Sequence, residues 1–157
     1  MTCRWLMLPV LGVLFAAVPF VADADDARDE AIRKDRQQIE GTWRIFTLVV
    51  NGNKSAGEDA RKLSVVNRAD GTWRLLSEGQ EVSRGTTMIN PTEMPKRIDI
   101  VTSEGDAKGQ VHPGIYELGE NTRRLCFAPP GKKRPTEFVS APDSDHIYVV
   151  FEREKSP

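Results

Sequence analysis

Residues 41–52 read Gly-Thr-Trp-Arg-Ile-Phe-Thr-Leu-Val-Val-Asn-Gly, and this stretch decides the fold class. Its β-branched and aromatic residues predict a strand from Thr42 to Val50, because such side chains are enriched in pleated, half-buried segments. The Asn51-Gly52 dipeptide that follows accepts the positive φ angles of a tight turn. The stretch therefore predicts the first strand of an antiparallel β-structure.

The rest of the chain likewise consists of short β-rich runs that are separated by Gly, Pro, Asn and Asp. Asp70-Gly71 and Glu78-Gly79 are hairpin signals, which indicate antiparallel pairing between neighbouring strands. Apolar and polar residues alternate in several runs, as expected for strands with one buried face. Eight strands are predicted, at residues 42–50, 63–67, 72–77, 81–89, 97–102, 110–118, 122–128 and 146–153.

Eight consecutive antiparallel strands can bury one face by closing into an up-and-down barrel or by folding into two packed sheets. We favour closure, because a barrel has no exposed strand edges. Gly41-Thr42-Trp43 also has the G-x-W form seen in lipocalins, where the tryptophan plugs one end of the barrel and a basic residue packs over it. Arg153 is placed to provide this cation–π contact. Residues 41–154 are therefore predicted to form an all-β, antiparallel, eight-stranded, lipocalin-like up-and-down barrel.

The chain begins with the features of a secretory signal peptide. Residues 1–24 contain one early charge, Arg4, then an apolar run up to Val21, and they end on the small-residue pattern Ala-Asp-Ala. The apolar run is interrupted by proline and glycine and is shorter than the roughly 20 residues that a bilayer span needs. We therefore expect a cleaved signal, no stable membrane span afterwards, and export to the periplasm or the extracellular space.

Residues 25–40 form a highly charged segment that is rich in helix-forming residues. Ile32 and Ile39 are the only residues of this segment that could form an apolar stripe. The segment is therefore predicted to be a short, solvated helical leader or tether. One further helical turn is predicted around Glu58 to Arg61.

The charge balance and the few cysteines and histidines exclude several classes of function. Lys and Arg total 22 and Asp and Glu total 23, so the chain has no excess of cations for binding a phosphate backbone, and we expect no nucleic-acid partner. Signal cleavage after Ala24 would remove Cys3 and leave Cys126 alone, so an internal disulfide is not expected. His112 and His146 are too few for a specific metal site, and we expect no metal or cofactor.

The sequence contains no recognisable catalytic motif. It has no nucleophile elbow, no Gly-rich phosphate loop and no calcium loop. Cys126 lies between Leu125 and Phe127 and is expected to be a small buried hydrophobe, since free cysteine is among the most buried residue types. A hydrolase would require His112 or His146 within hydrogen-bond reach of Cys126, or of a serine, in a cleft. We therefore expect no enzymatic activity.

Five short motifs occur in order within residues 38–154. They are Gly41-Thr42-Trp43, Pro113-Gly114-Ile115-Tyr116-Glu117-Leu118, Leu125-Cys126, Ala128-Pro129-Pro130-Gly131-Lys132 and Arg134-Pro135-Thr136-Glu137-Phe138. This ordered string resembles a lipocalin-like domain family that is abundant in planctomycete bacteria. The resemblance implies the barrel fold and an exported location, and it supplies no catalytic or ligand-binding residues.

By analogy of architecture, we expect the barrel to bind a small, mainly apolar ligand. Arg84 shares one face of its strand with Val82 and Met88, so it could point inward, where it would pair with a carboxylate on the ligand. A bulge or a register shift would turn it outward. The expected ligand-binding residues are Trp43, Ile45, Trp73, Leu75, Arg84, Ile98, Ile100, Phe127 and Val149.

The alternative is a non-enzymatic structural or interaction module of the cell envelope, in which the same residues fill a solid core. The loop from Pro129 to Phe138, with Lys132, Lys133 and Arg134, would then face an acidic envelope partner, unless these charges only keep a turn solvated. The modest apolar content slightly favours this alternative. An interior void above roughly 300 Å³ would favour the carrier, whereas a fully packed interior would exclude it.

Overall fold

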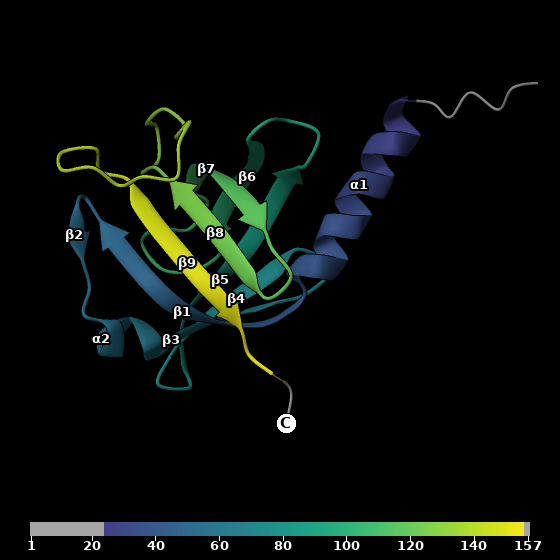
Figure 1. Cartoon of the computed structure of the whole chain (residues 1–157). Helices are drawn as coiled ribbons and strands as arrows, with labels where there is room; N and C mark the ends of the chain where they lie inside the picture. Colours follow the sequence, from purple (N-terminus) through teal and green to yellow (C-terminus); the bar gives the residue numbers. More distant parts are fainter. Residues whose placement is uncertain (1–23, 156–157) are drawn as a thin grey trace, which may run out of the picture.

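The chain forms a closed antiparallel β-barrel, described by a computed structural model for residues 24–155. Eight strands follow one another around the barrel, and the last strand pairs with the first to close it (Figure 1). The barrel strands are β1 (Gly41–Val50), β3 (Leu63–Asn67), β4 (Thr72–Ser77), β5 (Gln80–Asn90), β6 (Lys96–Thr102), β7 (Val111–Leu118), β8 (Thr122–Phe127) and β9 (Ile147–Arg153). The predicted eight-stranded up-and-down barrel is confirmed.

Tight turns join the strands at the predicted dipeptides. Gly71 and Gly79 have φ angles of +88° and +82°, a region that glycine enters without steric cost. The Asn51-Gly52 turn leads into β2 (Asn53–Lys54), a two-residue strand that pairs with the end of β1. The predicted helical turn is α2 (Gly57–Arg61), which connects β2 to β3.

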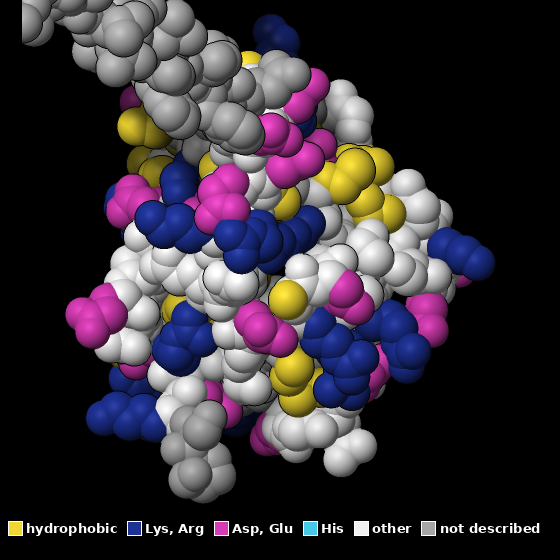
Figure 2. Space-filling view, turned by 90° about the vertical axis from the view of Figure 1, so that its right-hand side faces the viewer, with side chains coloured by type: hydrophobic (Ala, Val, Ile, Leu, Met, Phe, Trp, Pro, Cys, Tyr) yellow, Lys and Arg dark blue, Asp and Glu magenta, His cyan; other side chains and the backbone are white. Residues whose placement is uncertain are grey.

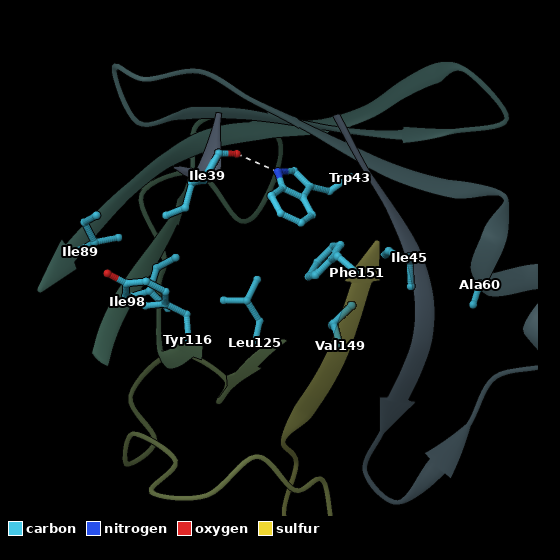
Figure 3. Close-up of a cluster of buried hydrophobic side chains, with 10 residues drawn as sticks. All are labelled: Ile39, Trp43, Ile45, Ala60, Ile89, Ile98, Tyr116, Leu125, Val149 and Phe151. Atoms are coloured by element: carbon cyan, nitrogen blue, oxygen red, sulfur yellow. Dashed lines mark hydrogen bonds between the residues drawn. The ribbon is translucent and has the colours of Figure 1, made fainter. Parts of the chain in front are cut away.

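The charged leader is a helix, α1 (Ala24–Ile39), but it is not solvated along its whole length. Its C-terminal half meets one end of the barrel and buries Asp35 and Ile39 (Figure 1). Ile39 joins the barrel core, and its carbonyl oxygen accepts a hydrogen bond of 2.7 Å from the indole N–H of Trp43 (Figure 3). The expectation of a solvated tether is therefore wrong for this half of the helix. Its anchoring contacts are made with distant strands, which the pattern of the helix itself does not reveal.

Side chains alternate between the interior and the surface along each barrel strand, as the pleat requires. On β5, Gly85 and Ile89 are buried, whereas Val82, Arg84 and Met88 lie on the exposed face. Bulges shift this alternation on β1, at Phe46 between Ile45 and Thr47, and on β5, at Val82 between Glu81 and Ser83, opposite Leu75 and Leu76 of β4. The buried core cluster consists of Ile39, Trp43, Ile45, Ala60, Ile89, Ile98, Tyr116, Leu125, Val149 and Phe151 (Figure 3).

The side of the molecule on which α1 lies is densely charged. Lys and Arg side chains alternate there with Asp and Glu side chains, and hydrophobic side chains are limited to small patches (Figure 2). Within residues 24–155, no helix is long and apolar enough to cross a membrane. The predicted signal peptide lies outside the described residues, except for Ala24, which begins α1.

Candidate functional site: the barrel interior

The barrel encloses a cavity of about 340 Å³. All eight barrel strands contribute to its wall, which is mostly apolar. This volume lies at the lower end of the range of about 300–1,000 Å³ that is usual for small-molecule sites. The interior is therefore hollow, which favours a carrier over the solid-core alternative. Its polar lining residues are Asn67, Thr87, Thr102, His112 and Arg123.

Most of the side chains predicted to contact a ligand surround this cavity. They come from five strands that are far apart in the sequence, and the closed barrel brings them together; three of them, Ile45, Ile98 and Val149, are drawn in Figure 3. Seven of the nine line the cavity wall: Ile45, Trp73, Leu75, Ile98, Ile100, Phe127 and Val149. The other two, Trp43 and Arg84, lie elsewhere.

Trp43 seals one end of the barrel and does not line the cavity. Its side chain is fully buried. The guanidinium of Arg153 lies 4.2 Å from the centre of the Trp43 ring, which confirms the predicted cation–π contact. Arg153 also donates hydrogen bonds to the carbonyl oxygens of Glu40 (2.8 Å) and Gln38 (2.5 Å). It thereby ties the end of α1 to the last strand.

Arg84 lies on the outer surface, so its inclusion among the expected ligand-binding residues is wrong. Its side chain is 50 % exposed and pairs with Glu81 (2.5 Å) and Glu104 (3.4 Å). Gly85 faces the interior in its place, where an added Cβ would come within 1.8 Å of the Val101 carbonyl oxygen and within 2.7 Å of the Trp73 ring. Because the two neighbouring strands leave no room for a side chain at this position, glycine takes the inward position, and the face that carries Arg84 turns outward.

A different arginine, Arg123, lies on the wall of the cavity. It is only 4 % exposed, and its guanidinium stacks on the rings of Phe151 (4.4 Å) and Trp43 (5.0 Å). Its Nε has no hydrogen-bond partner, and no ion pair within the described part of the chain involves this residue. Burial and then the charge of Arg153 lower the pKa of Arg123 to about 9, so it is still a cation at neutral pH.

Arg123 is not among the residues predicted from the sequence, although the sequence contains a signal for it. Arg123 is followed at every second position by Leu125 and Phe127, and in the structure these three residues share the inward face of β8. Arg124, on the opposite face, pairs with Glu117 at 2.5 Å on the surface. Applying the period-2 alternation to β8 would have placed a cation in the interior.

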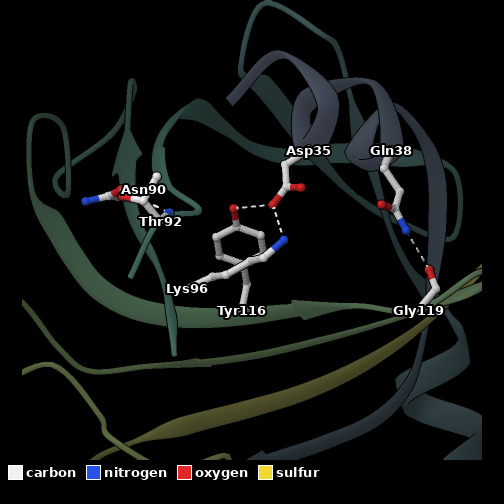
Figure 4. Close-up of polar contacts among 7 residues, drawn as sticks. All are labelled: Asp35, Gln38, Asn90, Thr92, Lys96, Tyr116 and Gly119. Carbon is white, nitrogen blue, oxygen red and sulfur yellow. Dashed lines mark hydrogen bonds and ion pairs between the residues drawn. The ribbon is translucent and has the colours of Figure 1, made fainter. Parts of the chain in front are cut away.

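A buried polar cluster fastens α1 across the closed end of the barrel. The Asp35 carboxylate accepts hydrogen bonds of 2.7 Å from the Tyr116 hydroxyl and from the Lys96 ammonium (Figure 4). Burial, together with the hydrogen bond to Asp35 and its charge, raises the pKa of Tyr116 well above its ordinary value. Nearby, Gln38 donates a hydrogen bond of 3.0 Å to the carbonyl oxygen of Gly119 (Figure 4).

A second contact of α1 closes the barrel over β5. The Arg36 guanidinium donates hydrogen bonds to the Thr87 hydroxyl (2.6 Å) and to the Thr87 carbonyl oxygen. It also packs on Gly71, where an added Cβ would come within 2.9 Å of the guanidinium. Burial lowers the pKa of Arg36. The helix end is thus held by hydrogen bonds of two neighbouring residues, Asp35 as an acceptor and Arg36 as a donor.

The opposite end of the barrel is apolar and open. Val50, the last residue of β1, lines the cavity and is 41 % exposed, so the cavity reaches solvent there. Leu48, Leu63 and Ile147 form the neighbouring wall. His112 lies at this end, edge-on to Phe127 with 6.1 Å between the ring centres.

Cys126 lies on the outer face of β8, beneath the segment that follows the strand. Its side chain is fully buried, as predicted, and its thiol donates a hydrogen bond of 3.3 Å to the carbonyl oxygen of Val139. Burial raises the pKa of this thiol, so it is protonated at neutral pH. His112 lines the interior instead, so the barrel wall separates it from Cys126. Within residues 24–155, no three His, Cys, Asp or Glu side chains are grouped so that they could hold a metal ion.

The basic loop between β8 and β9 uses one of its three cations internally. Arg134 donates hydrogen bonds to the carbonyl oxygens of Ile98 (2.8 Å) and Gly114 (2.7 Å) and pairs with Asp99 (2.7 Å). It therefore binds the loop to the outside of β6 and β7 and does not face outward toward a partner. Lys132 and Lys133 are exposed.

The chain matches no protein-family model, no curated protein and no solved structure. The function must therefore be inferred from the geometry of the barrel interior. This interior has two notable properties: a volume suited to a small molecule, and apolar walls interrupted at the closed end by a buried cation.

Proposed function

We propose that the protein is an exported, lipocalin-like carrier that binds a small, mainly apolar molecule inside its barrel. The observation that carries this proposal is the cavity of about 340 Å³, sealed beside α1 and open at the other end. Each square ångström of apolar ligand surface buried there contributes about 25 cal/mol to binding. The signal-peptide pattern of residues 1–24 supports export, and the ordered motifs support the lipocalin-like family.

The proposed role is binding, and it assigns no reaction to the protein. Cys126 is the only free cysteine within the described residues, and it is buried, protonated and hydrogen-bonded to a carbonyl oxygen. The cavity wall contains one imidazole, His112, which contacts Phe127. This lining suits the enclosure of an apolar molecule more than the activation of a nucleophile.

A neutral fluorescent probe, N-phenyl-1-naphthylamine, tests the proposal. We expect it to bind the wild-type protein with one-to-one stoichiometry and a blue-shifted emission. Val149→Phe places a larger side chain in the cavity wall and should weaken binding at least about tenfold, because the added ring occupies the space of the probe. Val82→Phe makes the same change on the exposed face of β5 and should leave binding unchanged.

Equal binding of the probe to both variants would contradict the proposal, because it would place the probe on the surface. Absence of binding to the wild-type protein would favour the structural-module alternative. Native mass spectrometry of the protein purified from its own organism gives an independent check. A small molecule that co-purifies with the wild-type protein and is lost from Val149→Phe is the expected result.

A further inference from the structure

The closed end of the cavity contains a charge that no described residue neutralises. A buried cation is costly unless an anion or hydrogen-bond acceptors compensate it. Arg123 is buried and lines the cavity, yet it has no ion pair and its Nε has no acceptor within the described part of the chain. Stacking on Trp43 and Phe151 stabilises the cation. It does not supply the oxygen acceptors that the N–H groups of a guanidinium require.

A second unsatisfied donor lies on the same cavity wall. Asn67 and Arg123 hold the only two buried side-chain nitrogen or oxygen atoms within residues 24–155 that have no hydrogen-bond partner. Both atoms are nitrogens, the Nδ2 of Asn67 and the Nε of Arg123. Asn67 pairs with Gly41 at the start of β1, and Arg123 stacks on Trp43 two residues further along β1. Both unsatisfied donors therefore belong to the closed end of the cavity.

The carboxylates near this end are either occupied or absent from the cavity wall. Asp35 is bound by Lys96 and Tyr116. None of the residues that line the cavity is Asp or Glu. An acceptor for Arg123 must therefore come from a molecule inside the cavity.

We propose that the ligand carries a carboxylate, which enters the barrel first and accepts hydrogen bonds from Arg123 and Asn67 at the closed end. The apolar part of the ligand then fills the remaining cavity toward Val50. One guanidinium matches one carboxylate in charge and in bidentate geometry, whereas a doubly charged phosphate would leave a net negative charge buried. The ligand class is thus a small monocarboxylate amphiphile. This inference rests on the carrier function proposed above.

Displacement of N-phenyl-1-naphthylamine by decanoate and by 1-decanol at neutral pH tests the head group. The two ligands have the same number of carbons and differ in charge. We expect the wild-type protein to bind decanoate at least about tenfold more tightly than 1-decanol, because charge-assisted hydrogen bonds to Arg123 form only with the carboxylate. Decyl phosphate should bind more weakly than decanoate.

Substitution of the buried arginine isolates its contribution. Arg123→Met keeps an apolar stem that reaches about as far as Nε and removes the guanidinium. It should weaken decanoate binding by about 10- to 100-fold while leaving 1-decanol binding unchanged or tighter. Arg84→Met is the matched control, because Arg84 is an exposed arginine on the outside of β5. It should bind both ligands as the wild-type protein does.

The outcomes separate this inference from the carrier function. Equal affinities of the wild-type protein for decanoate and 1-decanol, or tighter binding of decyl phosphate, would overturn the carboxylate assignment and leave the carrier intact. Failure of the neutral probe to bind at all would overturn the carrier. If Arg123→Met does not fold, the comparison of the three ligands on the wild-type protein still decides the assignment.

Discussion

The two ends of the barrel are held by different kinds of interaction. At the closed end, Asp35 and Arg36 of α1 form hydrogen bonds with three strands, and Trp43 is buried between the helix end and the barrel. At the open end, the wall consists of aliphatic side chains such as Val50 and Leu63, which are partly exposed. The difference indicates that the closed end contributes most of the stability and that the open end gives access to the cavity. This is expected because binding regions that must open are drawn from the less stable parts of a protein.

Removing the Trp43 side chain is expected to have the largest effect. Trp43→Ala should lower the free energy of unfolding by about 3–5 kcal/mol, because it leaves a large void where α1, β1 and β9 meet. Trp73→Ala removes the same side chain from the cavity wall, where it is only partly buried, and should cost about 1–2 kcal/mol. Urea denaturation followed by circular dichroism measures both. Equal losses of unfolding free energy in the two variants would contradict the claim that the closed end contributes most of the stability.

Breaking the Asp35 cluster is expected to have an intermediate effect. Asp35→Ala leaves Tyr116 and Lys96 without their acceptor and should cost about 2–3 kcal/mol, less than a fully buried pair, because the Lys96 side chain is 33 % exposed. Asp29→Ala is the control, since Asp29 is an exposed residue of the same helix; it should change stability by less than about 0.5 kcal/mol. Similar values for the two variants in thermal denaturation would show that α1 does not depend on this cluster.

The smallest expected effect is on the pH dependence of the free energy of unfolding above pH 10. The raised pKa of Tyr116 keeps its hydroxyl protonated in the folded protein, whereas the unfolded chain loses this proton near pH 10. The contribution of Tyr116 to stability is therefore complete below about pH 10 and is lost as the pH rises, with a slope approaching about 1.4 kcal/mol per pH unit. Tyr116→Phe should lose less stability than the wild-type protein between about pH 9 and about pH 11. Parallel curves for the two proteins in urea titrations would contradict this assignment.

Most of the barrel could be predicted because its signals are local. Turn dipeptides such as Asp70-Gly71 and Glu78-Gly79 fix hairpins within a few residues, and up-and-down topology pairs each strand with its neighbours in sequence. The docking of α1 could not be predicted in this way. Asp35 makes its hydrogen bonds with Lys96 and Tyr116, which lie 61 and 81 residues further along the chain.

The candidate site shows where the alternation of side chains predicts correctly and where it fails. In β8, Leu125 and Phe127 determine the inward face, so the position of Arg123 could have been inferred. In β5, neither face is strongly apolar, and the inward face is set by the contact of Gly85 with Val101 and Trp73 on the two neighbouring strands. That contact depends on the register between strands, which the sequence of β5 does not encode.

The position of a neutral molecule bound to the protein tests the central claim most directly. The claim is that the barrel is hollow, sealed beside α1 and open at Val50. In the complex with N-phenyl-1-naphthylamine, we expect intermolecular nuclear Overhauser effects from the probe to the methyl groups of Leu75, Ile100 and Val149. Effects limited to Val82 and Met88, on the outer face of β5, would contradict the account.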